Sequence, residues 1–263
     1  MIGKKIPLSK KQIEDLIKKY STFYIYDEKA IRENARNMIK TFYWMPGFKN
    51  YFAVKALPNP FILKILKDEG MGADCSSLPE LVLAEESGIK GENIMFTSND
   101  TPLEEFEKSK ELNVIINLDD ISHIPFIEKT IGLPNIICFR YNPGPARVGN
   151  SIIGNPKEAK YGFTKPQLFE GYRILKEKGV KRFGLHTMVA SNELEEEYFV
   201  ETAKMLFEIV VEVKEKLGID MEFVNLGGGI GIPYKPDQKP IDIQKISDGI
   251  KKEYENIIIK NGV

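Results

Sequence analysis

A lysine inside an apolar run is the first residue of this sequence that could carry chemistry. Lys55 lies in YFAVKALPNP, just before a proline-rich break that must end the run. If Lys55 points outward, its aliphatic stem packs between helices while its ammonium group reaches water. If it faces a barrel mouth at the carboxyl end of a strand, its desolvated amine loses a proton easily and can form a Schiff base. The residue alone favours neither reading.

A glycine-rich turn is the second feature. Gly227, Gly228, Gly229 and Gly231 directly follow an apolar run in LGGGIGIPY. Consecutive backbone amides can enclose a phosphate, although a tight strand-to-helix turn has the same composition. The turn follows the seventh predicted strand, and phosphate sites of β/α barrels recur after strands seven and eight. The spacing does not match a P-loop or a dinucleotide site, so a monophosphate is the better ligand.

An acid and a histidine lie near these features. Asp74 falls in a predicted buried strand next to that of Lys55, and a buried acid needs a cationic partner. His186 and Ser191 flank the end of the sixth predicted strand. His186 could serve either a structural or a catalytic purpose, whereas we assign His123, at a predicted helix start, to the structural class. The lysine, the acid and the glycine turn together predict a Schiff-base site with a phosphate anchor.

The elements that position these residues follow a regular alternation. Short apolar runs alternate with amphipathic stretches of helical period, the clearest from about 193 to 217. Apolar strands joined by helices imply a parallel sheet covered on both faces, and so many units favour a barrel. The sequence predicts an α/β fold, a TIM-type (β/α)8 barrel that stops before its eighth strand. The seven runs centre near residues 53, 74, 95, 115, 138, 185 and 224.

The two ends of the chain differ from this pattern. FYIYDE, residues 23–28, predicts a strand that precedes the first barrel helix and would belong to another sheet. We therefore divide the chain into residues 1–30, a helix and a strand, and residues 31–263, an incomplete barrel. A last helix is expected from about 241 to 260, followed by too few residues for an eighth strand. Residues 142–160 form the longest irregular stretch, and such loops are often functional.

Composition excludes several classes of protein. The 263 residues are 42% hydrophobic, which is enough for a sizeable core, and 37 basic against 38 acidic residues leave a net charge of -1. No basic excess points to nucleic acid, and no apolar segment approaches the roughly 20 residues of a membrane span. We expect a cytoplasmic protein. Cys75 and Cys138 have no paired spacing, which favours reduced thiols and no metal site.

Three runs carry a resemblance to a known family. YFAVKALPNP resembles the first barrel strand of the fold-type III pyridoxal-phosphate-dependent decarboxylases, which have an alanine-racemase-like barrel; GADCSSLPEL resembles their second strand, and LGGGIGIPY their phosphate loop. RYNPG and EAKYG are most similar to diaminopimelate decarboxylases. The resemblance extends from about Thr22 to Pro240. It implies a homodimeric enzyme that binds pyridoxal 5'-phosphate and decarboxylates an amino acid, meso-diaminopimelate, in lysine biosynthesis.

The resemblance also assigns roles to residues. It implies that Lys55 is the Schiff-base lysine, that Asp74 contacts the cofactor, that Ser191 helps to hold it, and that Gly227, Gly228 and Gly229 bind its phosphate. One departure is Met188, which stands where the family has a histidine stacked on the pyridine ring. His186 lies two positions earlier, on the same face of the strand, and can substitute. A thioether can also lie against an aromatic ring, so Met188 remains a candidate cofactor contact.

The second departure concerns length. The family's Glu-Pro-Gly-Arg segment and C-terminal β domain are absent from this sequence, and FYIYDE resembles the strand that pairs with that domain. We therefore expect the complete protein to be the enzyme and the 263-residue chain to be inactive alone. The alternatives are a decarboxylase of ornithine, arginine or carboxynorspermidine, and a non-catalytic homologue that binds a partner protein.

Overall fold

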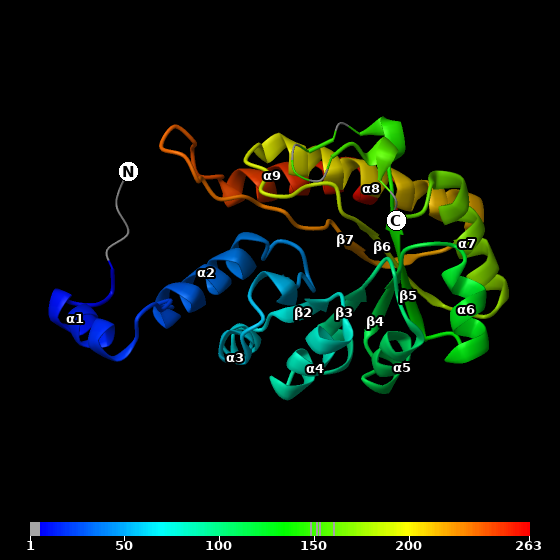
Figure 1. Ribbon diagram of the computed structural model, residues 1–263. Helices are drawn as coiled ribbons and strands as arrows, with labels where there is room; N and C mark the ends of the chain where they lie inside the picture. The colour runs from blue at the N-terminus through cyan, green and yellow to red at the C-terminus, as the bar shows by residue number, and fades with distance from the viewer. Residues whose placement is uncertain (1–5, 148, 151, 153, 160) are drawn as a thin grey trace.

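Seven parallel strands form the centre of the molecule. The computed structural model describes residues 6–147, 149–150, 152, 154–159 and 161–263. Within this part of the chain the strands make one sheet whose neighbours follow chain order from β1 to β7, as the sequence predicts. Figure 1 shows the sheet curling, with helices on its outer side. The strands are β1 (Tyr51–Ala53), β2 (Gly72–Cys75), β3 (Ile94–Thr97), β4 (Ile115–Leu118), β5 (Ile136–Tyr141), β6 (Arg182–Thr187) and β7 (Met221–Asn225).

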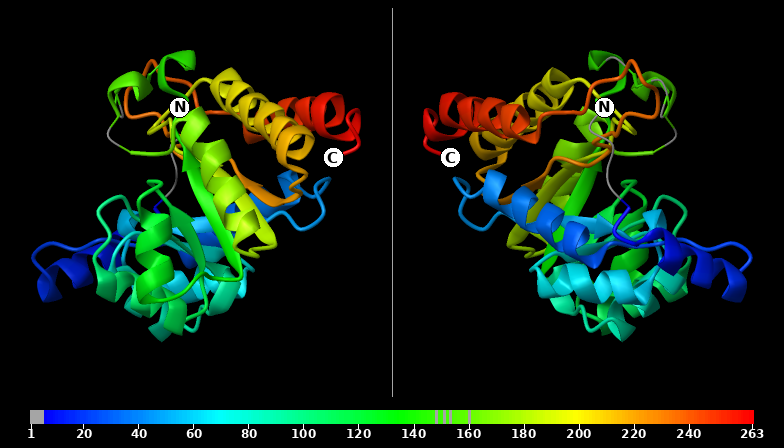
Figure 2. Two further views of the ribbon diagram at one scale, coloured as in Figure 1. Left: turned by 90° about the vertical axis from the view of Figure 1, so that its right-hand side faces the viewer. Right: turned by 90° about the vertical axis from the view of Figure 1, so that its left-hand side faces the viewer.

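Helices connect successive strands and cover the outer face of the sheet (Figures 1 and 2). Parallel pairing requires such crossovers, because the chain must return from the end of one strand to the end of the sheet where the next strand begins. The helices are α1 (Lys10–Lys19), α2 (Glu28–Thr41), α3 (Pro60–Asp68), α4 (Leu78–Glu86), α5 (Leu103–Glu111), α6 (His123–Thr130), α7 (Lys165–Glu177), α8 (Glu196–Leu217) and α9 (Ile243–Tyr254). Their order gives the α/β half-barrel that the alternation predicts.

The start of α3 shows how local sequence fixes the turn next to Lys55. The Asn59 side chain accepts hydrogen bonds from the backbone N–H groups of Phe61 and Ile62, at 3.0 and 3.4 Å. Pro60 occupies the first helical position, where its missing N–H would have no partner in the helix. Gly70, with a φ of +87°, follows the end of the helix. The chain therefore leaves β1 sharply, a few residues after Lys55.

Two apolar layers hold the sheet in place. The larger lies between the sheet and its helices and includes the buried Leu63, Phe106 and Leu206. The smaller lies on the concave face, where buried side chains from β3, β4 and β5 pack with Tyr51 of β1 and Phe223 of β7. Because β1 and β7 are the outermost strands, this contact shows that the sheet curls on itself. The buried members of the inner cluster are Met95, Ile115, Ile136 and Cys138.

The first and last parts of the barrel meet through a tryptophan. Trp44, after α2, donates from Nε1 to Oγ of Ser247 on α9 at 2.8 Å, and Ser247 Oγ donates to the Thr41 carbonyl at 2.8 Å. The Trp44 ring also lies 5.8 Å from that of Tyr254, centroid to centroid. These contacts join the helix that precedes β1 to the helix that follows β7. They bring the two edges of the sheet to the same side of the molecule.

The segment at the N-terminal end departs from the prediction. Helix α1 forms, but Phe23 to Asp27 make no strand within the described residues. A strand needs a neighbour for its backbone hydrogen bonds, and the described chain offers none here. Tyr24 is 87% exposed, and Ile25 and Tyr26 are also exposed. Figure 1 shows α1 extending away from the barrel. The assignment of residues 1–30 to a separate unit stays a prediction.

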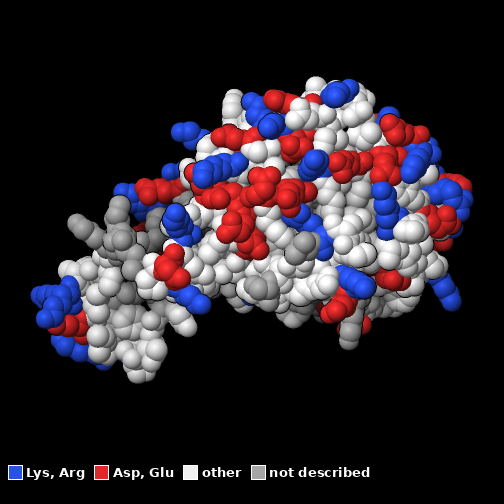
Figure 3. All heavy atoms as spheres, turned by 90° about the horizontal axis from the view of Figure 1, so that it is seen from above, with Lys and Arg blue, Asp and Glu red and all other residues white. Residues whose placement is uncertain are grey.

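The surface shows charges of both signs. Figure 3 shows lysine and arginine interspersed with aspartate and glutamate on the face seen from above, with a group of acidic side chains near its centre. This face therefore carries no continuous basic patch for a polyanion. Among the described residues, no helix has the length and apolar character needed to cross a bilayer.

Candidate active site

Lys55 lies at the rim of the half-barrel beside an acid. The residue sits in the 3-10 turn Val54–Ala56, directly after β1, and its side chain is exposed. Asp74 lies on β2, in register with Ala53 of β1. Burial raises the pKa of the Asp74 carboxyl to about 6, against a hydrogen bond from Thr97 and the positive charge of Lys55, which both lower it. The predicted lysine and acid are therefore electrostatic neighbours at the carboxyl ends of adjacent strands.

Polar side chains continue this rim across the sheet. The inner apolar cluster includes Met95 and Ile115, and side chains two residues further along a strand share the same face. That rule places a polar residue above the apolar cluster on each of several strands. Together they make a polar layer at the carboxyl end of the half-barrel. Its members are Asp74, Thr97, Asn117, Arg140, His186 and Asn225.

His186 lies inside the half-barrel and is neutral. Its side chain is 6% exposed, and its Nδ1 lies 2.7 Å from Nδ2 of Asn117 on β4. Burial lowers the pKa of the imidazole to about 3, and the nearby charge of Arg140 lowers it further in the same direction. His186 is therefore uncharged at neutral pH and acts as a hydrogen-bonding group of the polar layer.

Arg140 is the cation of this layer. Its Nε donates to Oδ1 of Asp119 at 2.5 Å, and its guanidinium lies 4.7 Å from the ring centroid of Tyr161. Tyr161 directly follows the long loop, residues 142–160, that the sequence singles out. Arg140 therefore ties that loop to the rim, and its charge reaches both Asp74 and His186.

The glycine turn presses against the end of β6. A side chain at Gly227 would come within 2.3 Å of the Thr187 carbonyl oxygen, and one at Gly229 within 2.2 Å of that of Ala190. Gly227 and Gly229 also have positive φ values, +77° and +88°. Only glycine fits both positions. Gly228 lies between them, exposed, with no atom within 4 Å of its missing Cβ.

The donors of this turn fit a phosphate. The backbone N–H groups of Gly228 and Gly229 donate to no other group among the described residues, while Gly227 N donates to Oδ1 of Asn225 at 2.9 Å. Adjacent free amides on an open turn make a concave anion site. The residues present therefore fit the phosphate end of pyridoxal phosphate, and Lys55 fits its aldehyde end.

Ser191 and Met188 lie between the turn and the long loop. The Ser191 backbone N–H donates to Oδ1 of Asn150 at 3.3 Å, so this residue is tied to the loop. Met188, partly buried beyond the end of β6, lines a small hollow with Tyr141 and Tyr161. Met188 and Ser191 thus lie by the rim, and their contact with a cofactor stays a prediction.

Sequence reasoning missed Thr97, Asn117, Arg140 and Asn225. Each lies on an inward face near the carboxyl end of a strand that is otherwise apolar, as in IMFT and IINL. This repeated position was a usable signal, because a buried polar side chain needs a partner, and the partners lie at the same height on neighbouring strands. His123, by contrast, packs its ring on that of Phe106 at 5.7 Å, which agrees with the predicted structural purpose.

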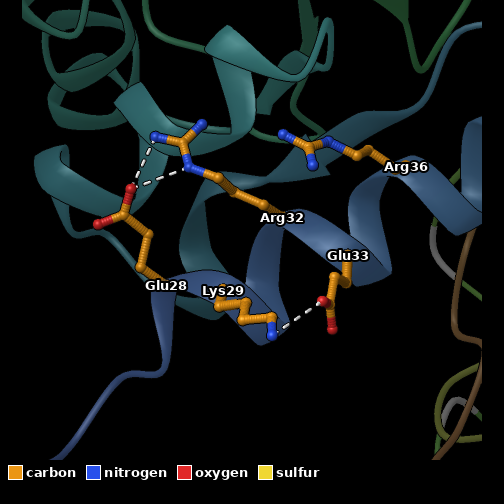
Figure 4. A pocket seen from close by; sticks show the side chains of 5 residues that line it. All are labelled: Glu28, Lys29, Arg32, Glu33 and Arg36. Atoms are coloured by element: carbon orange, nitrogen blue, oxygen red, sulfur yellow. Dashed lines mark hydrogen bonds and ion pairs between the residues drawn. The ribbon is translucent and has the colours of Figure 1, made fainter.

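A pocket on α2 is a weaker candidate for the active site than the rim. A shallow pocket on α2 is lined by Glu28, Lys29, Arg32, Glu33 and Arg36 (Figure 4). Both of its arginines already pair with Glu69, at 2.9 and 2.6 Å, so the pocket links α2 to α3. Among the described residues no group of His, Cys, Asp or Glu could hold a metal ion. The rim of the half-barrel is therefore the candidate site.

Asp74→Asn is expected to stabilise the cofactor-free protein at pH 8 by about 1–3 kcal/mol. The folded carboxyl, with a pKa of about 6, keeps a proton that the unfolded chain releases near its ordinary value of 3.8. Stability of the wild type therefore falls as pH rises between these values, and the asparagine avoids this loss. Urea unfolding at pH 4, 6 and 8 measures the difference, which should grow from pH 4 to 6 and then level off.

The exposed acid Asp248 on α9 supplies the matched control. Its Oδ1 accepts a hydrogen bond from Gln244, which asparagine can also accept, so Asp248→Asn should change stability by less than about 0.5 kcal/mol. An Asp74→Asn protein no more stable than wild type at pH 8 would contradict the prediction.

Comparison with known proteins defines the class. The chain matches the family described as pyridoxal-dependent decarboxylase, pyridoxal binding domain, over residues 28–262. It belongs to this family, whose cofactor is pyridoxal phosphate. The curled parallel sheet and the rim therefore form a pyridoxal-binding barrel.

Three similar proteins show which decarboxylases this chain resembles and how much of their length it covers. Protein TabA of Pseudomonas amygdali pv. tabaci is 39% identical, over 91% of this chain and 56% of its own. A diaminopimelate decarboxylase of Methanothermobacter thermautotrophicus is 30% identical, over 95% of this chain and 59% of its own. The crystal structure of diaminopimelate decarboxylase from M. jannaschii with L-lysine superimposes with a TM-score of 0.84 at 29% identity, over 93% of this chain and 60% of that one. The chain thus spans about three fifths of the length of these relatives.

Proposed function

We propose that the protein containing this chain is a pyridoxal-phosphate-dependent decarboxylase that converts meso-diaminopimelate to lysine and CO2. One observation carries the proposal: Lys55, Asp74 and the glycine turn lie at the carboxyl edge of one curled sheet in a pyridoxal-binding domain. Barrels of this type place their chemistry at that edge. Lysine biosynthesis, a cytoplasmic location and a homodimer are parts of the same proposal.

The residues of the rim have distinct tasks. Pyridoxal phosphate, when bound, supplies the electron sink that accepts the electron pair left by the departing CO2. Lys55 would hold the cofactor covalently, and Asp74, as an anion, would favour a positive charge on the Lys55 nitrogen. The free amides of Gly228 and Gly229 would take the phosphate. The side chains of Ser191, Met188 and His186 would line the cofactor site.

The substrate rests on the relatives. The M. thermautotrophicus relative carries the name diaminopimelate decarboxylase, and the M. jannaschii structure of that name contains L-lysine, its expected product. TabA carries no substrate in its name and shares more of its residues with this chain. A decarboxylase of another amino acid, such as ornithine, arginine or carboxynorspermidine, is therefore the second candidate.

A substrate comparison tests the proposal. The full-length gene product, loaded with pyridoxal phosphate, should release CO2 from meso-diaminopimelate with a kcat/KM at least about tenfold above that for ornithine, arginine or carboxynorspermidine, a transition-state preference of about 1.4 kcal/mol. A preference for one of the other three would replace the substrate but keep the class. Cofactor binding without CO2 release from any of them would favour the non-catalytic homologue, for which Met188 is the motivating departure.

A further inference from the structure

A line of hydrogen bonds crosses the interior of the half-barrel from β6 to β2. Nδ2 of Asn117 lies 2.7 Å from Nδ1 of His186 and 3.2 Å from Oγ1 of Thr97. Oγ1 of Thr97 lies in turn 3.2 Å from Oδ1 of Asp74. Four side chains on four different strands are thus linked in series. The two intermediate residues have no task in the cofactor chemistry described above.

The hydrogen bonds of this line diverge from Asn117, one toward His186 and two in series toward Asp74. The Asn117 amide nitrogen has two hydrogens, one for His186 Nδ1 and one for Thr97 Oγ1, and the Thr97 hydroxyl hydrogen is then directed at Asp74. His186 Nδ1 must accept, so its proton lies on Nε2. Asn117 is 2% exposed, and its amide nitrogen makes both contacts of the line, whereas its Oδ1 has no partner among the described residues.

We propose that Thr97 and Asn117 are positioning residues, which hold Asp74 as an anion beside Lys55 and couple its protonation to the tautomer and hydrogen bonding of the buried His186. When Asp74 gains a proton, it no longer needs the Thr97 hydroxyl hydrogen. Thr97 can then rotate, and the Asn117 amide loses its fixed acceptor. The change is transmitted to His186 without a change in the imidazole's own charge.

The charges around Asp74 are consistent with this arrangement. Lys55 from the turn after β1 and Arg140 from β5 favour the anion, whereas Glu80 from α4 opposes it. Burial raises the pKa of the neighbouring Cys75 and Cys138 thiols, so these stay neutral. Thr97 is thus the neutral donor that acts on Asp74 from an adjacent strand, and burial raises the Asp74 pKa to about 6, within reach of ordinary buffers. His186, with a pKa of about 3, stays neutral over the same range.

The chain's two histidines make the coupling measurable. The full chain is labelled with 15N-histidine, without cofactor, and the imidazole 15N shifts are followed from pH 4.5 to 8. We expect His186 to show a protonated Nε2 and an unprotonated Nδ1 throughout, with a shift step near pH 6 that reports Asp74. His123→Gln assigns the two sets of signals. Asp74→Asn should remove the step at His186.

Thr97→Val tests the link itself, because it keeps the shape and removes the hydroxyl. The step at His186 should disappear, and Thr97→Ser should restore it. Thr187→Val is the matched control: Thr187 is a buried threonine at the end of β6 that donates to the Tyr141 carbonyl at 2.8 Å, outside the line. It should keep the step. An unchanged step in Thr97→Val, or a proton on His186 Nδ1, would overturn the proposal.

A second measurement connects the line to the cofactor, and this part rests on the proposed function. Loss of the hydroxyl donor removes a hydrogen bond to an anion, so the pH below which pyridoxal phosphate is released should rise by about one unit in Thr97→Val. An unmoved release pH, together with a lost step at His186, would remove Asp74 from cofactor retention but leave the coupling intact. Failure of the NMR result would leave the proposed decarboxylase untouched.

Discussion

Lys55→Ala is expected to abolish retention of pyridoxal phosphate. The wild-type chain, mixed with the cofactor and passed through a desalting column, should keep a visible absorbance, whereas the variant should lose it completely. The reason is covalent, because Lys55 directly follows the end of β1 beside the half-buried Asp74, where an amine can react with the cofactor aldehyde. Borohydride reduction and peptide mapping should place the pyridoxyl group on Lys55.

Lys49 supplies the control for this experiment. It lies just before β1, at the opposite end of the same strand, and its amine hydrogen-bonds to Asn93. Lys49→Ala should keep the absorbance. A pyridoxyl group on any lysine other than Lys55 would show that the assignment of the rim is wrong.

Residues 1–263 alone are expected to lack decarboxylase activity. Residues 1–263, expressed alone, should bind pyridoxal phosphate and yet release CO2 from meso-diaminopimelate at well below the ordinary enzyme range of about 1–1000 per second. Lys55 and the glycine turn, the proposed cofactor contacts, both lie within these residues. In the described structure, however, β1 and β7 each pair on one side only, and about two fifths of the length of each matched relative lies outside the match.

The test follows CO2 and lysine release by residues 1–263 beside the longer relative named diaminopimelate decarboxylase from M. thermautotrophicus, at equal cofactor occupancy. A turnover rate of residues 1–263 within a few-fold of that of the longer enzyme would contradict the prediction. It would mean that the retained residues suffice for catalysis and that the open edges are harmless.

Much of the architecture follows from sequence pattern. All seven predicted strands form, because each is a short and mainly apolar run that a sheet packed on both faces can bury. The last helix also forms, although its regular part, α9, ends at Tyr254, before the predicted residue 260. The strand predicted at 23–28 does not form, since strand propensity cannot supply a pairing partner. Its exposed Tyr24 and Tyr26 show the pattern without the neighbour.

The site was predictable only in part. Lys55, Asp74 and the glycine turn stand out in the sequence. Lys55 and Asp74 are charged residues in predicted apolar strands, and the glycine turn is a flexible run directly after one. Thr97 and Asn117 break no such rule strongly, since a single threonine or asparagine is common at a strand end. Their link appears only when strand registers bring β2, β3, β4 and β6 to one height. Register depends on tertiary packing, which local sequence does not contain.

The contact between Trp44 and Ser247 has a consequence for the order of folding. Each strand pairs with the one before it, so most of the sheet can grow from short-range contacts as the chain emerges. The hydrogen bond between Trp44 and Ser247 instead joins residues 203 positions apart, so it can form only when nearly the whole chain is available. Because Trp44 is the sole tryptophan of the sequence, its fluorescence records this last event apart from the growth of the sheet.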